Sequence, residues 1–117
     1  MTPTTLDLQA FPQSNTDRVI PKLSGKLSLE TVHGFLQTVR PEAAKQLILD
    51  MNGVSFLDSA GVGALVQVYV HRRSLGQSFV LTGLSKQSCA VMQVAGLTRL
   101  LPIHASVEDA LAAKSQA

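Results

Sequence analysis

The chain has 117 residues, of which 45% are hydrophobic and 15% charged, and its formal net charge is +2. This length supports a single core, and the composition is typical of a globular domain rather than a disordered chain. Lysines and arginines are dispersed along the sequence, and the aromatic residues are four Phe and one Tyr. The small basic excess therefore does not predict nucleic-acid binding. We expect one domain over residues 1–117, with loose tails at 1–5 and 114–117.

The first expected elements are strands. Near the N-terminus, apolar residues alternate as in an edge strand, at Leu6, Leu8 and Phe11. A turn over 12–15 follows. Segment 18–23 predicts a second strand, in which Pro21 belongs at an edge or a bulge, and Ser24-Gly25 is expected to end it.

Helical spacing begins at residue 29. Its apolar positions are Leu29, Val32, Leu36 and Val39. Pro41 ends this predicted helix, because proline disfavours a helical residue before it. Residues 47–51 are predicted to form a buried strand, and Asn52-Gly53 predicts a turn after it.

A longer helix is predicted from Ser59 to the C-cap glycine Gly76. We place its apolar stripe at Val62, Leu65, Val66, Tyr69 and Val70. The rest of its surface is assigned to Gln67, His71, Arg72 and Arg73, which puts cations near its C-terminus.

Strands and helices alternate over the remaining chain. We expect a strand at 79–82, a helix from the N-cap Ser85 to residue 95, a strand at 100–103, and a helix from Ser106 to residue 113. This alternation predicts an α/β fold with a mixed, mostly parallel sheet of about five strands and about four helices.

Helix 86–95 is apolar on nearly every side, so it is either deeply buried or in contact with a partner. Its cysteine, Cys89, is the only one in the chain, which excludes an internal disulfide and a multi-thiolate metal site. Its apolar surroundings predict a buried structural thiol, as expected in a reducing cytoplasm.

The most informative segment is 47–65, where a strand runs through Asp58, Ser59, Ala60 and Gly61 into a helix. A helix N-terminus presents unpaired backbone N–H groups and the positive end of the helix dipole. A serine there can be a cap, a nucleophile or a phosphate acceptor. From spacing alone, capping by Asp58 or Ser59 is the commonest role.

Enzyme and cofactor signatures are incomplete. A nucleophile elbow needs glycine where Leu57 stands, and Gly61-x-Gly63 completes neither a dinucleotide fingerprint nor a P-loop. The three histidines are scattered in surface or half-buried contexts, at His33, His71 and His104. We therefore expect no catalysis, no metal site and no cofactor.

Several segments together resemble the STAS domain, named for sulfate transporters and anti-sigma factor antagonists. The resemblance is carried by Asp50, residues 54–61, the helix start at 62–65, Leu23–Leu27, Gly96-Leu97 and residues 106–111. It implies the STAS fold over most of the chain, and it is closest to bacterial anti-sigma factor antagonists.

In such antagonists the serine after the motif aspartate is phosphorylated by the partner, an anti-sigma factor that is also a kinase, and phosphorylation ends binding. The resemblance therefore implies a phosphorylation site at Ser59, with a phosphatase as a further candidate partner. Partner contacts are expected at Asp58, Ser59, Ala60, Gly61, Gly25 and Ser28. The family usually has an acid at the position of Ser28, whereas the first acid after Gly25 in this chain is Glu30.

Two alternatives stay open. Similar stand-alone domains serve as accessory subunits of membrane transporters, including lipid-handling ATP-binding cassette systems, where the helix after Ser59 docks on another subunit. A scaffold in a stress-signalling assembly would show self-association. The sequence lacks a signal peptide pattern and an apolar run of about 20 residues, so we expect a cytoplasmic protein without direct membrane insertion.

Overall fold

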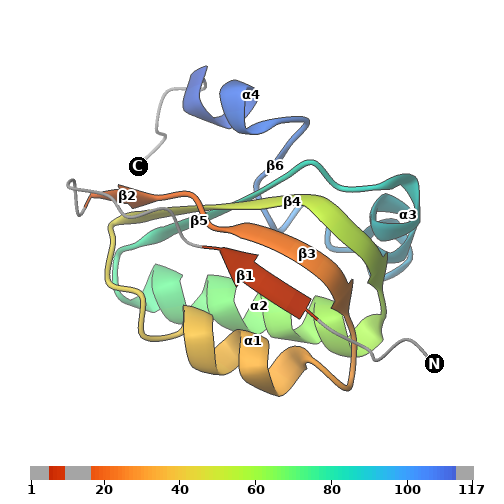
Figure 1. The fold of residues 1–117 in the computed structure, drawn as a ribbon. Coiled ribbons are helices and arrows are strands. Elements are labelled where there is room, and N and C mark those ends of the chain that lie inside the picture. Colours follow the sequence, from red (N-terminus) through yellow and green to blue (C-terminus); the bar gives the residue numbers. More distant parts are fainter. Residues whose placement is uncertain (1–5, 10–16, 113–117) are drawn as a thin grey trace.

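The computed structural model describes residues 6–9 and 17–112 (Figure 1). These form one α/β domain with four helices and a six-stranded sheet of order β1-β3-β4-β5-β6, in which β2 also pairs with β4. The strands are β1 (Leu6–Gln9), β2 (Arg18–Val19), β3 (Lys22–Leu27), β4 (Gln46–Leu57), β5 (Ser78–Thr82) and β6 (Ile103–His104). The helices are α1 (Val32–Val39), α2 (Ser59–Ser74), α3 (Lys86–Val94) and α4 (Val107–Ala112).

The sheet is mostly parallel, as predicted. Only β1 is antiparallel to its neighbour, β3. Helices α1 and α2 cover one face, α4 lies over the other, and α3 lies beside the end of β4 (Figure 1). The main core is built between the sheet and α1 and α2, where Leu27, Leu49 and Leu65 are completely buried.

The strand predicted at 18–23 begins at Arg18 as expected, but it is divided into β2 and β3 and continues to Leu27 rather than ending at Leu23. β2 and β3 run along the same side of β4 as one interrupted line, and the interruption falls at Ile20-Pro21 because proline has no N–H to donate. The Pro21 carbonyl still accepts a hydrogen bond from Asp50 N at 3.0 Å. Gly25 lies inside β3 with φ of 105°, so it bends the strand without ending it.

The turn predicted at Asn52-Gly53 is also wrong, because β4 continues to Leu57. Two register shifts against β3 each place an extra residue in β4, which bends the strand and keeps it paired. A Cβ on Gly53 would lie 2.9 Å from the Leu23 carbonyl oxygen, so only glycine allows this approach. The lengthened strand reaches directly to Asp58.

The helices follow the prediction more closely than the strands do. α1 begins at Val32 rather than 29, and the residues before it form a turn in which Ser28 O accepts from Thr31 N and Val32 N. The last strand begins at Ile103 rather than 100, since Leu100 N and Leu101 N both donate to Leu97 O. The expected contributions of Phe11, of the turn at 12–15 and of residue 113 lie outside the described residues.

The buried thiol predicted at Cys89 is wrong. Cys89 is exposed, and the buried residues of α3 are Ser88 and Met92. Val94, on the same helix, is 90% exposed. α3 packs at the end of the sheet through one side only, so its apolar composition does not lead to burial all round.

The surface position predicted for Arg72 and the place of Val70 in the apolar stripe of α2 are both wrong. Arg72 is 1% exposed, whereas Val70 is 56% exposed. The buried face of α2 follows Gly61, Leu65, Val68 and Arg72 at helical spacing.

The Arg72 guanidinium is satisfied by backbone carbonyls. It donates to Ser78 O at 2.9 Å, to Glu42 O at 3.0 Å and to Ala44 O. Burial lowers the pKa of Arg72, and the Glu42 carboxylate opposes part of that shift. One side chain therefore joins the end of α2 to the segments that enter β4 and β5.

We predict that Arg72→Met lowers the free energy of unfolding by about 3 kcal/mol, because it leaves buried carbonyls without donors. The matched control is Arg73→Met, an exposed neighbour for which we expect a change within about 0.5 kcal/mol. Urea denaturation followed by circular dichroism measures both. Equal stability of the two variants would contradict this role.

Candidate functional site

The candidate site lies where β4 passes into α2, and Asp58 organises it. Its Oδ1 accepts from Gly61 N at 2.8 Å, which caps α2, and its Oδ2 accepts from Leu29 N at 3.1 Å. Asp58 N donates to Leu27 O at 3.3 Å, and Asp58 O accepts from Val62 N at 2.9 Å. One aspartate therefore fixes both the helix start and the loop after β3.

Ser59 is the first residue of α2 and is exposed. Its hydroxyl has no hydrogen-bond partner within the described residues, so of the two candidate caps it is Asp58 that caps the helix. Ser85 and Ser106 differ, because their hydroxyls accept from Ser88 N and Asp109 N, both at 3.0 Å. Ser59 thus presents a free hydroxyl at a helix N-terminus, where added negative charge is favoured.

Ser28 is buried in the loop between β3 and α1, with 3% of its surface exposed. Its hydroxyl donates to Glu30 Oε1 at 3.0 Å, and its N–H donates to Thr31 Oγ1 at 3.0 Å. The partner contact expected at the Ser28 side chain is not available in this structure. The Glu30 carboxylate that accepts from Ser28 is itself exposed, and Leu29 is the exposed apolar residue of the loop.

The other expected contact residues divide between surface and interior. Ser59 is exposed and Ala60 is half-buried, whereas Gly61 is buried. A Cβ on Gly61 would collide with Leu27 O and lie 2.8 Å from Leu57 Cδ1, so this glycine serves close packing between α2 and β3. Gly25 pairs with Val54 inside the sheet, so it is not part of the loop beside Ser59.

Gln87 was not among the predicted site residues, yet it holds the end of β4. β5 pairs with β4 only as far as Asp50, which leaves the later residues of β4 without a strand on that side. The Gln87 side-chain amide takes the place of a strand at Leu57, accepting from its N–H at 3.0 Å and donating to its carbonyl at 2.7 Å. No local sequence signal indicates this contact, because it joins residues 30 apart.

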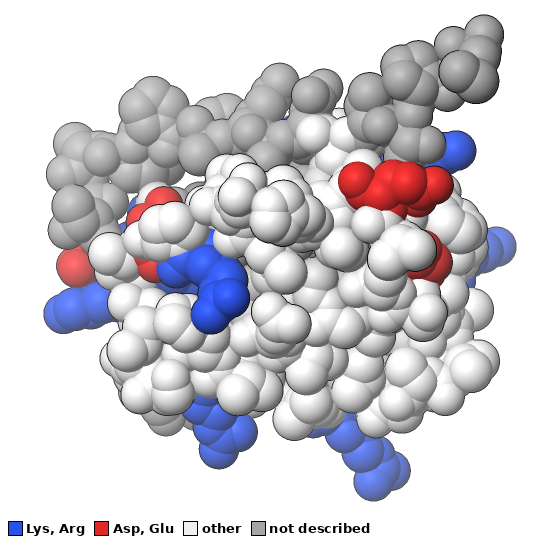
Figure 2. Space-filling model, turned by 90° about the horizontal axis from the view of Figure 1, so that it is seen from below, with Lys and Arg blue, Asp and Glu red and all other residues white. Residues whose placement is uncertain are grey.

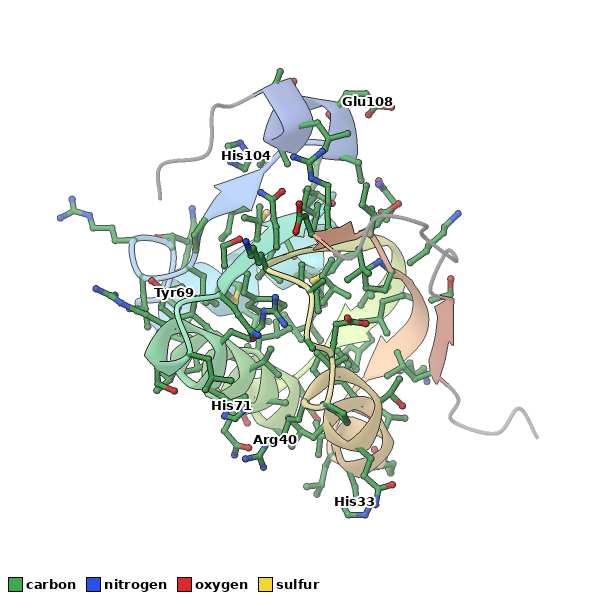
Figure 3. All side chains as sticks on the ribbon, turned by 90° about the vertical axis from the view of Figure 1, so that its left-hand side faces the viewer. His33, Arg40, Tyr69, His71, His104 and Glu108 are labelled. Atoms are coloured by element: carbon green, nitrogen blue, oxygen red, sulfur yellow. The ribbon has the colours of Figure 1, made fainter. Side chains whose placement is uncertain are left out.

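The acids at the site are Asp58 and Glu30, and the helix that follows Asp58 is uncharged over most of its length. Residues 59–71 contain no Asp, Glu, Lys or Arg, and Figure 2 shows a mostly uncharged face over α1 and α2. The histidines do not converge, since His33 and His104 lie at opposite sides of the molecule and His71 lies on α2 (Figure 3). Within 6–9 and 17–112, no cluster of three His, Cys, Asp or Glu side chains could hold a metal ion.

Comparison with known proteins places the chain in a family. Residues 11–110 match the STAS domain, and the chain belongs to this family. The fold is similar to that of an anti-sigma factor antagonist from Mycobacterium paratuberculosis, with 20% identity, 96% coverage of both chains and a TM-score of 0.82.

Three further solved structures are informative. The anti-sigma factor antagonist SpoIIAA in its unphosphorylated form has 22% identity over 90% of this chain and 93% of its own, with a TM-score of 0.74. The phosphorylated form of this Bacillus protein matches with a TM-score of 0.67. The murine anion transporter Slc26a9 matches 85% of this chain but only 18% of its own, at 24% identity and a TM-score of 0.74. In the part of our chain that the structure describes, no helix has the length and apolar character needed to cross a membrane.

We predict that Asp58→Ala lowers the free energy of unfolding by about 1–2 kcal/mol, because it removes the cap of α2 and the bond to Leu29 N. Ser59→Ala is the control and is expected to change stability by less than about 0.5 kcal/mol, since the Ser59 hydroxyl has no hydrogen-bond partner within the described residues. Thermal and urea unfolding measure both variants. A destabilised Ser59→Ala protein with a stable Asp58→Ala protein would reverse our assignment of the cap.

We also predict opposite effects at the two glycines of α2. Gly61→Ala is expected to destabilise the protein by about 1–3 kcal/mol through overpacking against Leu27. Gly63→Ala is expected to stabilise it by about 0.5–1 kcal/mol, because no atom outside the adjoining backbone of α2 lies within 4 Å of the new Cβ and alanine favours the helix. Urea midpoints that move in the same direction would refute the packing role of Gly61.

Proposed function

We propose that this protein is a cytoplasmic anti-sigma factor antagonist whose binding to an anti-sigma factor is switched off by phosphorylation of Ser59. The protein acts by binding and catalyses no reaction itself. The observation that carries the proposal is the Ser59 hydroxyl, which is exposed at the start of α2 and unused in capping because Asp58 caps the helix. A modification there leaves the hydrogen bonds of the fold intact.

Phosphate at this position would change binding more than folding. Phosphoserine carries roughly −1.5 to −2 charges at pH 7, and the helix N-terminus tolerates that charge. A partner seated on the uncharged face of α2 would have to desolvate it beside the Asp58 carboxylate. The same group is therefore tolerated in the free protein and unfavourable in the complex.

The family supports this proposal. The antagonists with similar folds include SpoIIAA, which is known in phosphorylated and unphosphorylated forms. The partner proposed for our chain is an anti-sigma factor with serine kinase activity, which would use ATP to phosphorylate Ser59. A phosphatase would restore binding.

A second candidate function is that of an accessory domain of a membrane transporter. It is favoured by the uncharged surface of α2, which would suit permanent contact with another subunit, and by the similarity to part of an anion transporter. A permanent subunit has no need for a reversible charge at Ser59, so dependence of binding on the state of Ser59 separates the two functions.

We predict that Ser59→Glu weakens binding to purified anti-sigma factor kinases of the source organism at least about tenfold, whereas Ser59→Ala retains binding but accepts no phosphate from ATP. The matched control is Ser74→Glu, which adds the same charge at the exposed far end of α2 and is expected to bind like the wild type. Calorimetric titration measures affinity, and mass spectrometry locates the phosphate. Equal affinities of Ser59→Glu and Ser74→Glu would overturn the switch.

A further inference from the structure

We propose that Leu29 is the apolar anchor by which this protein docks on its partner, its side chain entering an apolar pocket of the anti-sigma factor beside Ser59. This inference rests on the proposed function for the identity of the partner. Leu29 is 72% exposed, and its N–H donates to the Asp58 carboxylate, so this apolar side chain lies in water beside the residue that precedes Ser59.

The backbone around Leu29 is held in place. Leu29 N donates to Asp58 Oδ2, the neighbouring Ser28 O accepts from Thr31 N and Val32 N, and Thr31 Oγ1 donates to Lys26 O at 2.8 Å. A loop bonded in this way loses little backbone entropy when a partner binds, so its exposed leucine is pre-organised for docking.

The bond to Asp58 also sets where Leu29 lies. Asp58 directly precedes Ser59 and receives hydrogen bonds from both Leu29 N and Gly61 N. A partner that covers Leu29 therefore also approaches the start of α2. Phe56 is exposed too, but neighbouring residues of a strand point to opposite faces, and Leu57 packs toward Gly61. Phe56 thus lies on the sheet face away from α2.

The charges beside Leu29 favour a protein as the occupant. Both charged side chains bonded to this loop are carboxylates, Asp58 on Leu29 N and Glu30 on the Ser28 hydroxyl. An anionic lipid surface or a nucleic acid would be repelled there. An apolar pocket in a protein, with a neutral or basic rim, complements a leucine between two acids.

Anchoring at Leu29 would make the Ser59 switch effective. With Leu29 seated in its pocket, the adjoining start of α2 is shielded from water, and phosphate on Ser59 would lose its hydration. Without such an anchor, a partner could shift away from the phosphate at little cost. With Leu29 bound in its pocket, the charge of a phosphate on Ser59 would therefore be enough to release the partner.

The test compares Leu29→Ala with Leu75→Ala, a leucine that is 58% exposed at the other end of α2. We expect Leu29→Ala to weaken binding to the purified anti-sigma factor kinase about tenfold or more and Leu75→Ala by less than about twofold. Because both side chains are exposed, both variants should fold, and urea denaturation checks this. Equal affinities for the two variants would overturn the anchor, and the Ser59 switch would still stand.

A second measurement does not depend on choosing the partner in advance. A benzophenone amino acid replaces Leu29 or Leu75 in the full chain, and cells are irradiated before adducts are identified by mass spectrometry. An anti-sigma factor kinase joined at position 29 only, and lost in Ser59→Glu, supports both proposals. A transporter subunit joined at position 29, whose purified form loses affinity in Leu29→Ala, supports the anchor and refutes the proposed function. Absence of any adduct at position 29 overturns the anchor.

Discussion

The two hydrogen bonds accepted by the Asp58 carboxylate are the constraint on which the site depends. Through Gly61 N the carboxylate caps α2, and through Leu29 N it ties the loop after β3 to the same point. Because the Asp58 carboxylate accepts both hydrogen bonds, the hydroxyl of the following residue, Ser59, is not needed to cap α2 or to hold the loop. A residue whose hydroxyl supports no other group can gain and lose a phosphate without unfolding the protein.

The long strand β4 makes this arrangement possible. It passes through two register shifts against β3 and continues beyond the last residue that β5 pairs with it. Gln87 satisfies the backbone of Leu57 on that open side, so the strand stays extended until Asp58. The position of Ser59 therefore depends on a side chain from α3 as well as on its own strand and helix.

The two ends of α2 are anchored by different chemistry. At the start, a carboxylate binds backbone N–H groups, and at the end the buried guanidinium of Arg72 binds the carbonyls of Glu42, Ala44 and Ser78. Both side chains match the partial charge of their helix end. Between them, residues 59–71 contain no Asp, Glu, Lys or Arg, so the exposed surface of α2 there is uncharged.

The sequence by itself determined the α/β alternation, the helix ends set by Ser85, Gly76 and Pro41, and the junction of strand and helix at Asp58-Ser59. These features depend on local periodicity, caps and a short motif, each of which is formed by residues close together in the sequence. Tertiary structure alone decided that Asp58 rather than Ser59 is the cap and that β4 passes through Asn52-Gly53. It also decided that Ser28 and Arg72 are buried while Leu29 and Cys89 are exposed. Each of these depends on hydrogen bonds and packing between segments distant in the chain, such as Leu29 with Asp58, and no local pattern records such contacts.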